Sequence, residues 1–131
     1  MDSKNTSVVA VWARHRTALG NAAEEHVLSM MLARGWRLLQ RHYRSPGRGG
    51  GEIDLIMRDR EGVVVFVEVR QRSSRKWGGA LASVTRAKQR RIIWAARHFL
   101  MHWPGDPPFC RFDVVGLEPD GVKWIRGAFT L

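Results

Sequence analysis

Apolar residues recur along this chain at two different spacings, which separate expected helices from expected strands. From Ala10 to Arg34 the spacing is helical, with Gly20 as a break after a short lead-in and Gly35 as the C-terminal stop. A second helix is expected from Ser83, as its N-cap, to His102, because an apolar stripe runs along it. The stripe consists of Val84, Ala87, Ile92, Ala95, Ala96, Phe99 and Leu100.

The remaining apolar segments have the length and pattern of strands. Val63–Val69 is a nearly continuous β-branched run, which is typical of a central strand buried on both faces. The other expected strands are Trp36–Tyr43, Glu52–Arg58, Phe109–Leu117 and Val122–Ile125. The order α-β-β-β-α-β-β predicts an α/β fold with one mixed sheet flanked by helices. We expect one domain over residues 10–131, preceded by a flexible tail at residues 1–9.

The charge balance adds a candidate partner to this picture. The chain has 22 basic and 12 acidic residues, a net charge of +10. Arginine supplies most of the positive charge, and its planar fork matches phosphate, so the composition favours nucleic acid as partner. The expected loop Gln71–Gly79 is basic, with Arg72, Arg75 and Lys76, and the expected loop Ser45–Gly50 contributes Arg48 as a further candidate contact.

Cysteine content and hydropathy limit the kinds of site and the cellular compartment to be expected. Cys110 is the only cysteine in the sequence, which excludes an internal disulfide and a cysteine-based zinc site. A reducing cytoplasm fits this composition. The purely apolar runs are far too short for a membrane-spanning helix, so we expect no membrane partner.

A carboxylate inside the most apolar strand, Glu68, is the first sign of chemistry. A buried carboxylate is costly unless it is paired or bound to a metal. Asp59 and Gly62 fit the first position and the left-handed position of a three-residue hairpin loop. Asp59 would then pair with Val63, and counting back places Asp54 opposite Glu68 with their Cβ atoms about 5 Å apart.

Two interpretations of this pair follow from the spacing. Facing carboxylates repel unless a cation lies between them, and oxygen ligands favour Mg²⁺ or Mn²⁺. Such a metal, with nucleic acid as partner, would support phosphodiester hydrolysis. Alternatively, Glu68 forms a buried ion pair with Arg70, which lies on the same strand face, or with another arginine.

Several motifs in a fixed order give the chain a family resemblance. They are Gly20-x-x-x-Glu24, Gly51-Glu52-Ile53-Asp54-Leu55-Ile56, Val65-Phe66-Val67-Glu68-Val69-Arg70, Lys88 and Arg111-Phe112-Asp113-Val114-Val115. With these motifs the chain resembles the YraN family of uncharacterised bacterial proteins. More broadly, it is similar to the restriction-endonuclease-like (PD-(D/E)xK) superfamily of nucleases, which implies a three-layer core with a central mixed sheet.

The resemblance also implies roles for individual residues. Asp54 and Glu68 would hold the metal, while Glu24 would add a ligand or orient a metal-bound water; the alternative for Glu24 is an exposed helix charge. Gly51 and its loop would allow a phosphate backbone to approach closely. Arg111 and Asp113 share a strand face and are expected to form a structural ion pair.

Arg70 departs from the superfamily pattern, which has lysine at this position. Arginine keeps the charge and can clamp a phosphate, but it does not give up a proton, so a role in activating water is weakened. Lys88 could supply an ammonium group from the neighbouring helix instead.

Three functions follow from these features. The first is a metal-dependent nuclease, with DNA favoured over RNA and branched or damaged structures among the candidate targets. The second is a non-catalytic nucleic-acid-binding protein that keeps the fold, and the third is an interaction protein whose basic surface meets an acidic partner. His98 and His102 stand four apart on an expected helix, a spacing that can hold a metal, but the glutamate of the usual zinc motif is missing.

Overall fold

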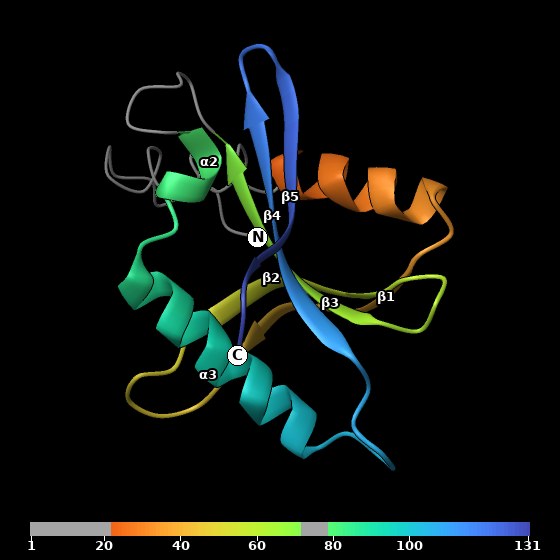
Figure 1. The fold of residues 1–131 in the computed structure, drawn as a ribbon, viewed down its shortest axis with the longest axis vertical. Helices are drawn as coiled ribbons and strands as arrows, with labels where there is room; N and C mark the ends of the chain where they lie inside the picture. Colours follow the sequence, from red (N-terminus) through yellow and green to blue (C-terminus); the bar gives the residue numbers. More distant parts are fainter. Residues whose placement is uncertain (1–21, 72–78) are drawn as a thin grey trace, which may run out of the picture.

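The computed structural model describes residues 22–71 and 79–131. A helix covering residues 22–33 comes first in the described chain (orange in Figure 1). The elements that follow it are β1 (Arg37–Arg44), β2 (Glu52–Arg58), β3 (Val64–Gln71), α2 (Gly79–Ala82), α3 (Arg86–Met101), β4 (Cys110–Glu118) and β5 (Gly121–Phe129). The five strands form one sheet in the order β1-β2-β3-β4-β5, in which only β3 and β4 run parallel. The expected mixed sheet is therefore confirmed.

Helices cover both faces of this sheet and create two apolar cores. On one face, Val27 and Met31 of the first helix pack in a cluster with Leu55 and Val67. On the other face, α3 packs against Phe66 and Phe112, using its buried residues Ile92, Ala95 and Ala96 (Figure 1). The fold is thus a three-layer α/β arrangement, consistent with a restriction-endonuclease-like core.

Most expected elements are present, with their ends shifted by a few residues. The central strand β3 is buried on both faces over most of its length, as its β-branched run indicates. The N-cap of α3 is wrongly predicted: Thr85, not Ser83, accepts a hydrogen bond from the Lys88 N–H (3.2 Å). The short helix α2 was not predicted, since the expected loop ended at Gly79 and the next element began at Ser83. It lies over β4, where the Ala80 side chain fills the space above Gly116.

Some expectations concern parts of the chain that the structure does not describe. The tail at residues 1–9 and the helix break at Gly20 lie outside the described residues. No helix in residues 22–71 or 79–131 is both long and apolar enough to cross a membrane.

The β2–β3 hairpin has the turn that the sequence predicts. The Asp59 N–H donates to the Val63 carbonyl (2.9 Å), the Gly62 N–H donates to the Asp59 carbonyl (3.1 Å), and Gly62 has φ +88°. The ladder then pairs Arg58 with Val64 and continues to Leu55 with Val67. The next step in this register places Asp54 opposite Glu68, which confirms the predicted register.

Candidate metal-binding site

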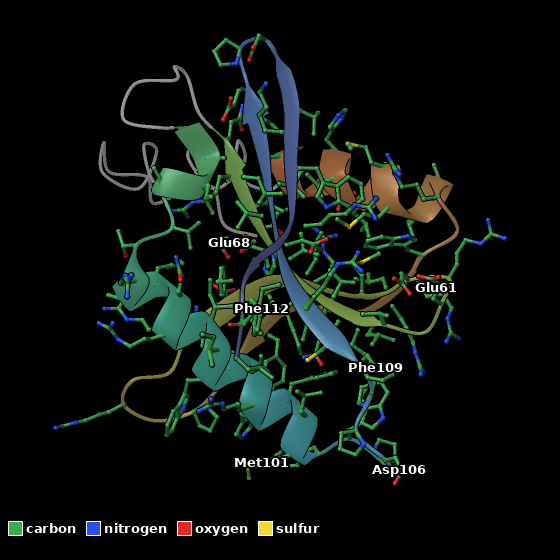
Figure 2. All side chains as sticks on the ribbon, in the orientation of Figure 1. Glu61, Glu68, Met101, Asp106, Phe109 and Phe112 are labelled. Atoms are coloured by element: carbon green, nitrogen blue, oxygen red, sulfur yellow. The ribbon has the colours of Figure 1, made fainter. Side chains whose placement is uncertain are left out.

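Asp54 and Glu68 lie where strands β2 and β3 begin to separate. The backbone ladder between these strands ends at the Leu55–Val67 pair. Beyond it, Asp54 Oδ2 accepts a hydrogen bond from the Val69 N–H (2.8 Å), so the Asp54 carboxylate, and not a main-chain carbonyl, is the acceptor at this position. Figure 2 shows Glu68 in the space between the sheet and the helices α2 and α3. The hairpin thus brings the two carboxylates together on the α3 side of the sheet.

Burial and mutual repulsion raise the pKa values of Asp54 and Glu68, so this carboxylate pair tends to retain a proton. Glu68 is only 3% exposed, and its Oε1 atom accepts no hydrogen bond from any residue in the described ranges 22–71 and 79–131. Burial, followed by the charge of Asp54, raises the pKa of Glu68 to about 8. Burial also raises the pKa of Asp54, although the hydrogen bond from Val69 opposes the shift. A cation placed between the carboxylates would replace this proton and supply the missing partner.

Two basic side chains flank Glu68 from different elements. Arg70 Nη1 lies 3.2 Å from Glu68 Oε2, so the ion pair considered as an alternative is present. The same guanidinium also donates to Ser83, through Nε to Oγ (2.9 Å) and Nη2 to the carbonyl oxygen (2.8 Å). Lys88 Nζ lies 3.7 Å from Glu68 Oε2. Arg70 is therefore committed to protein contacts, and Lys88 brings an ammonium group from α3 to the carboxylate pair.

Glu24 lies near the pair, but its carboxylate contacts basic side chains. Its charge contributes to raising the pKa of Asp54. Glu24 Oε1 is hydrogen-bonded to His42 and lies 3.6 Å from Arg41 Nη2. These contacts hold Glu24 beside the carboxylate pair, and its role as an additional ligand remains a prediction.

His42 is the residue of this neighbourhood that the sequence did not indicate. In the β1–β2 register it falls between the pairs Arg41–Leu55 and Tyr43–Ile53, which places it opposite Asp54. Its φ of 51° is left-handed, which is uncommon for a non-glycine residue. The hydrogen bond to Glu24 is the main cause that raises the pKa of the His42 ring. A single histidine in an edge strand carries no sequence pattern that would mark it.

The oxygen ligands present suit a hard divalent cation. Within the described ranges, no three His, Cys, Asp or Glu side chains form a ready-made metal cluster. Mg²⁺ commonly binds through one or two carboxylates and completes its shell with water and substrate phosphates. Two carboxylates with an unpartnered buried oxygen meet that requirement, whereas a closed zinc site would need four protein ligands.

The other predicted phosphate contacts are only partly within the described chain. Arg48 is exposed in the 45–50 loop, whereas Arg72, Arg75 and Lys76 lie outside the described residues. Gly51 was expected to let a phosphate backbone approach, but the space freed by its missing side chain is taken up by α3. A Cβ atom there would lie 2.7 Å from the Arg91 carbonyl oxygen, so α3 itself occupies the space.

Two further candidates have structural roles. Arg111 Nε donates to Asp113 Oδ1 (3.0 Å), as predicted, and Asp113 also accepts from the Trp124 indole (3.0 Å) and the Gly127 N–H (3.1 Å). This ion pair lies on the sheet face opposite to Glu68, because Asp113 is beside Val67 of the other core. His98 is hydrogen-bonded to Tyr43, which explains the helical histidine without a metal.

Comparison with known proteins identifies the family. The model of the Uncharacterised protein family UPF0102 matches residues 23–117. A UPF0102 protein of Paracidovorax citrulli (strain AAC00-1) is 59% identical over 112 residues, which cover 86% of this chain and 82% of the relative. A UPF0102 protein of Acidovorax sp. (strain JS42) is 55% identical over 117 residues, covering 89% of this chain and 88% of the relative. With a match that spans β1 to β4, α3 and the candidate site, the chain belongs to the uncharacterised protein family UPF0102.

Proposed function

We propose that this protein is a metal-dependent nuclease that hydrolyses phosphodiester bonds in nucleic acid, with DNA as the favoured substrate, in the cytoplasm. The observation that carries the proposal is the buried Asp54–Glu68 pair, in which no described residue donates to Glu68 Oε1 and Lys88 lies alongside. A structural ion pair alone does not account for a second buried carboxylate beside the first. The net charge of +10 supports a polyanionic substrate.

Each residue has a distinct task in this proposal. Asp54 and Glu68 would hold one Mg²⁺ or Mn²⁺ ion, which when bound polarises a phosphate oxygen and lowers the pKa of a water. The Val69 N–H fixes the orientation of Asp54. Lys88 offers its ammonium group to the phosphate, while Arg70 keeps Glu68 in position from its anchor on Ser83.

Substitution of the carboxylates tests the proposal. Asp54→Asn and Glu68→Gln should each lower Mg²⁺- or Mn²⁺-dependent cleavage more than about 100-fold, because each removes a metal ligand. The assay is a time course on single-stranded, duplex, flapped and four-way DNA, and on one RNA, with EDTA as a control. Glu61→Gln is the matched control variant, since Glu61 is exposed at the hairpin tip far from Glu68 (Figure 2). Wild-type protein that cuts none of these substrates with either metal would overturn the nuclease proposal.

A second candidate function is a nucleic-acid-binding protein without turnover. The observation in its favour is Arg70, which stands where the related nucleases have lysine and has its guanidinium occupied by Glu68 and Ser83. Binding to the same substrates without cleavage would select this function. In that case Asp54→Asn should leave binding unchanged or strengthen it, because it removes a charge that repels phosphate.

A further inference from the structure

A small polar cavity lies next to the carboxylate pair, between the loop after β1 and helix α3. Its volume is about 360 Å³. It is lined by Arg44, Ser45, Gly47, Gly50, Gly51, Glu52, Lys88, Arg91 and Ile92. Figure 1 shows this loop (gold) beside α3. We refer to this space as the loop–helix cavity.

The walls of the loop–helix cavity are fixed by contacts within the protein. Ser45 is buried, and its Oγ atom accepts a hydrogen bond from the Gly51 N–H (3.3 Å). The Ser45 N–H donates back to the Gly51 carbonyl (3.2 Å), which closes the loop. Gly51 packs directly on the main chain of Arg91, so the loop and α3 are held together. The cavity is therefore preformed, and little ordering is needed for a ligand to enter.

The charges on these walls favour an anion. Three cationic side chains, Arg44, Lys88 and Arg91, line the cavity against one carboxylate. That carboxylate, Glu52, lies 3.5 Å from Arg44. Arg91 is exposed and has no ion pair with any residue in the described ranges. At least one guanidinium is thus free to form the bidentate contact that phosphate prefers.

The size and lining indicate which part of a nucleic acid would enter. Ligand pockets range from about 300 to 1,000 Å³, so this cavity suits a group of about one nucleotide. None of the described residues that line it is aromatic, so those residues offer no side chain on which a base could stack. The contacts would therefore be made to the sugar–phosphate backbone, which positions a strand without reading its sequence.

Lys88 connects this cavity to the candidate metal site. It lines the cavity, and its Nζ atom lies 3.7 Å from Glu68 Oε2. We infer that the loop–helix cavity binds a backbone phosphate next to the phosphate at Asp54 and Glu68, with Arg44 and Arg91 as its main contacts. The inference rests on the proposed function, because that function places a nucleic-acid strand at Asp54 and Glu68. It adds a second phosphate-binding site, which fixes the position of that nucleic-acid strand.

The test measures binding without cleavage. A fluorescein-labelled single-stranded DNA and an abasic strand of equal length are titrated in EDTA, with fluorescence anisotropy as the readout. Arg91→Ala and Arg44→Ala should each weaken binding of both strands about three- to tenfold and lower the salt slope by about 0.7, the loss of one phosphate contact. Arg97→Ala is the matched control, since Arg97 is exposed on the same helix but does not line the cavity.

The possible results separate this inference from the proposed function. Equal affinities for Arg91→Ala, Arg44→Ala and Arg97→Ala would overturn the inference, even if Asp54→Asn abolishes cleavage. Weaker binding for the two cavity variants, with no cleavage by wild type, would support the inference and remove the nuclease proposal. Competition by inorganic phosphate alone at low millimolar concentration would reassign the cavity to a free anion. Tight binding of the normal strand but not the abasic strand would also contradict backbone recognition.

Discussion

Replacing Glu68 by glutamine should change how the stability of this protein depends on pH. The pKa of Glu68 is raised to about 8, whereas an unfolded glutamate titrates near 4.5. The folded protein therefore retains a proton between these values that the unfolded chain loses. The contribution of Glu68 to stability is then fully present below about pH 4.5 and is lost as the pH rises through about 8.

The size of the effect follows from the same two values. A shift of this extent corresponds to roughly 5 kcal/mol across the whole titration, and to about 3 kcal/mol between pH 4.5 and pH 7. The raised pKa of Asp54 acts in the same direction. Glu68→Gln cannot ionise, so its stability should not show this loss. Its broken contacts with Arg70 and Lys88 should lower stability by an amount that varies little with pH.

The assay is urea unfolding at a series of pH values from 4.5 to 8.5, followed by circular dichroism. The measured quantity is the free energy of unfolding of Glu68→Gln minus that of wild type, which should rise by several kcal/mol with pH. Glu61→Gln, the exposed control, should give a nearly constant difference. A flat difference for Glu68→Gln would refute the argument that burial and Asp54 together hold the proton.

The same measurement in the presence of Mn²⁺ tests the metal site. A bound cation replaces the proton, so Mn²⁺ should stabilise wild type most at pH 8. The gain is about 2.7 kcal/mol at 100 times the dissociation constant. Glu68→Gln should gain much less. Equal stabilisation of both proteins would place any Mn²⁺ binding elsewhere.

Two further substitutions distinguish structural from chemical roles. Arg70→Lys should lower the free energy of unfolding by about 1–3 kcal/mol, since lysine cannot reproduce both contacts with Ser83. Thermal unfolding measures this change. Unchanged stability would show that the Arg70–Ser83 contacts contribute little. Asp113→Asn should lower the free energy of unfolding by about 1–3 kcal/mol, because it weakens the hydrogen bonds from Arg111, Trp124 and Gly127 while Arg111 keeps its contact with Asp59 (3.4 Å). Mn²⁺ affinity should be unchanged, since the pair lies on the opposite face of the sheet, and a large loss of affinity would contradict that separation.

The sequence determined those features that depend on local patterns. The spacing of apolar residues indicates the helices and strands, because each element buries one face or stripe at its own period. The hairpin register could be counted from Asp59 and Gly62, since the turn's hydrogen bonds involve neighbouring residues. That count alone placed Asp54 opposite Glu68.

The tertiary structure decided which distant groups complete the site. Ser83 anchors Arg70, His42 contacts Glu24, and neither contact has a sequence signal because the partners are on separate elements. Gly51 is occupied by the main chain of Arg91, which depends on how closely α3 approaches the loop. That no residue of the described part of the chain donates to the buried Glu68 Oε1 likewise depends on how the elements pack around it. Periodicity and turn hydrogen bonds depend on residues that are close in the sequence. The contacts between separate elements form only when the helices pack against the sheet.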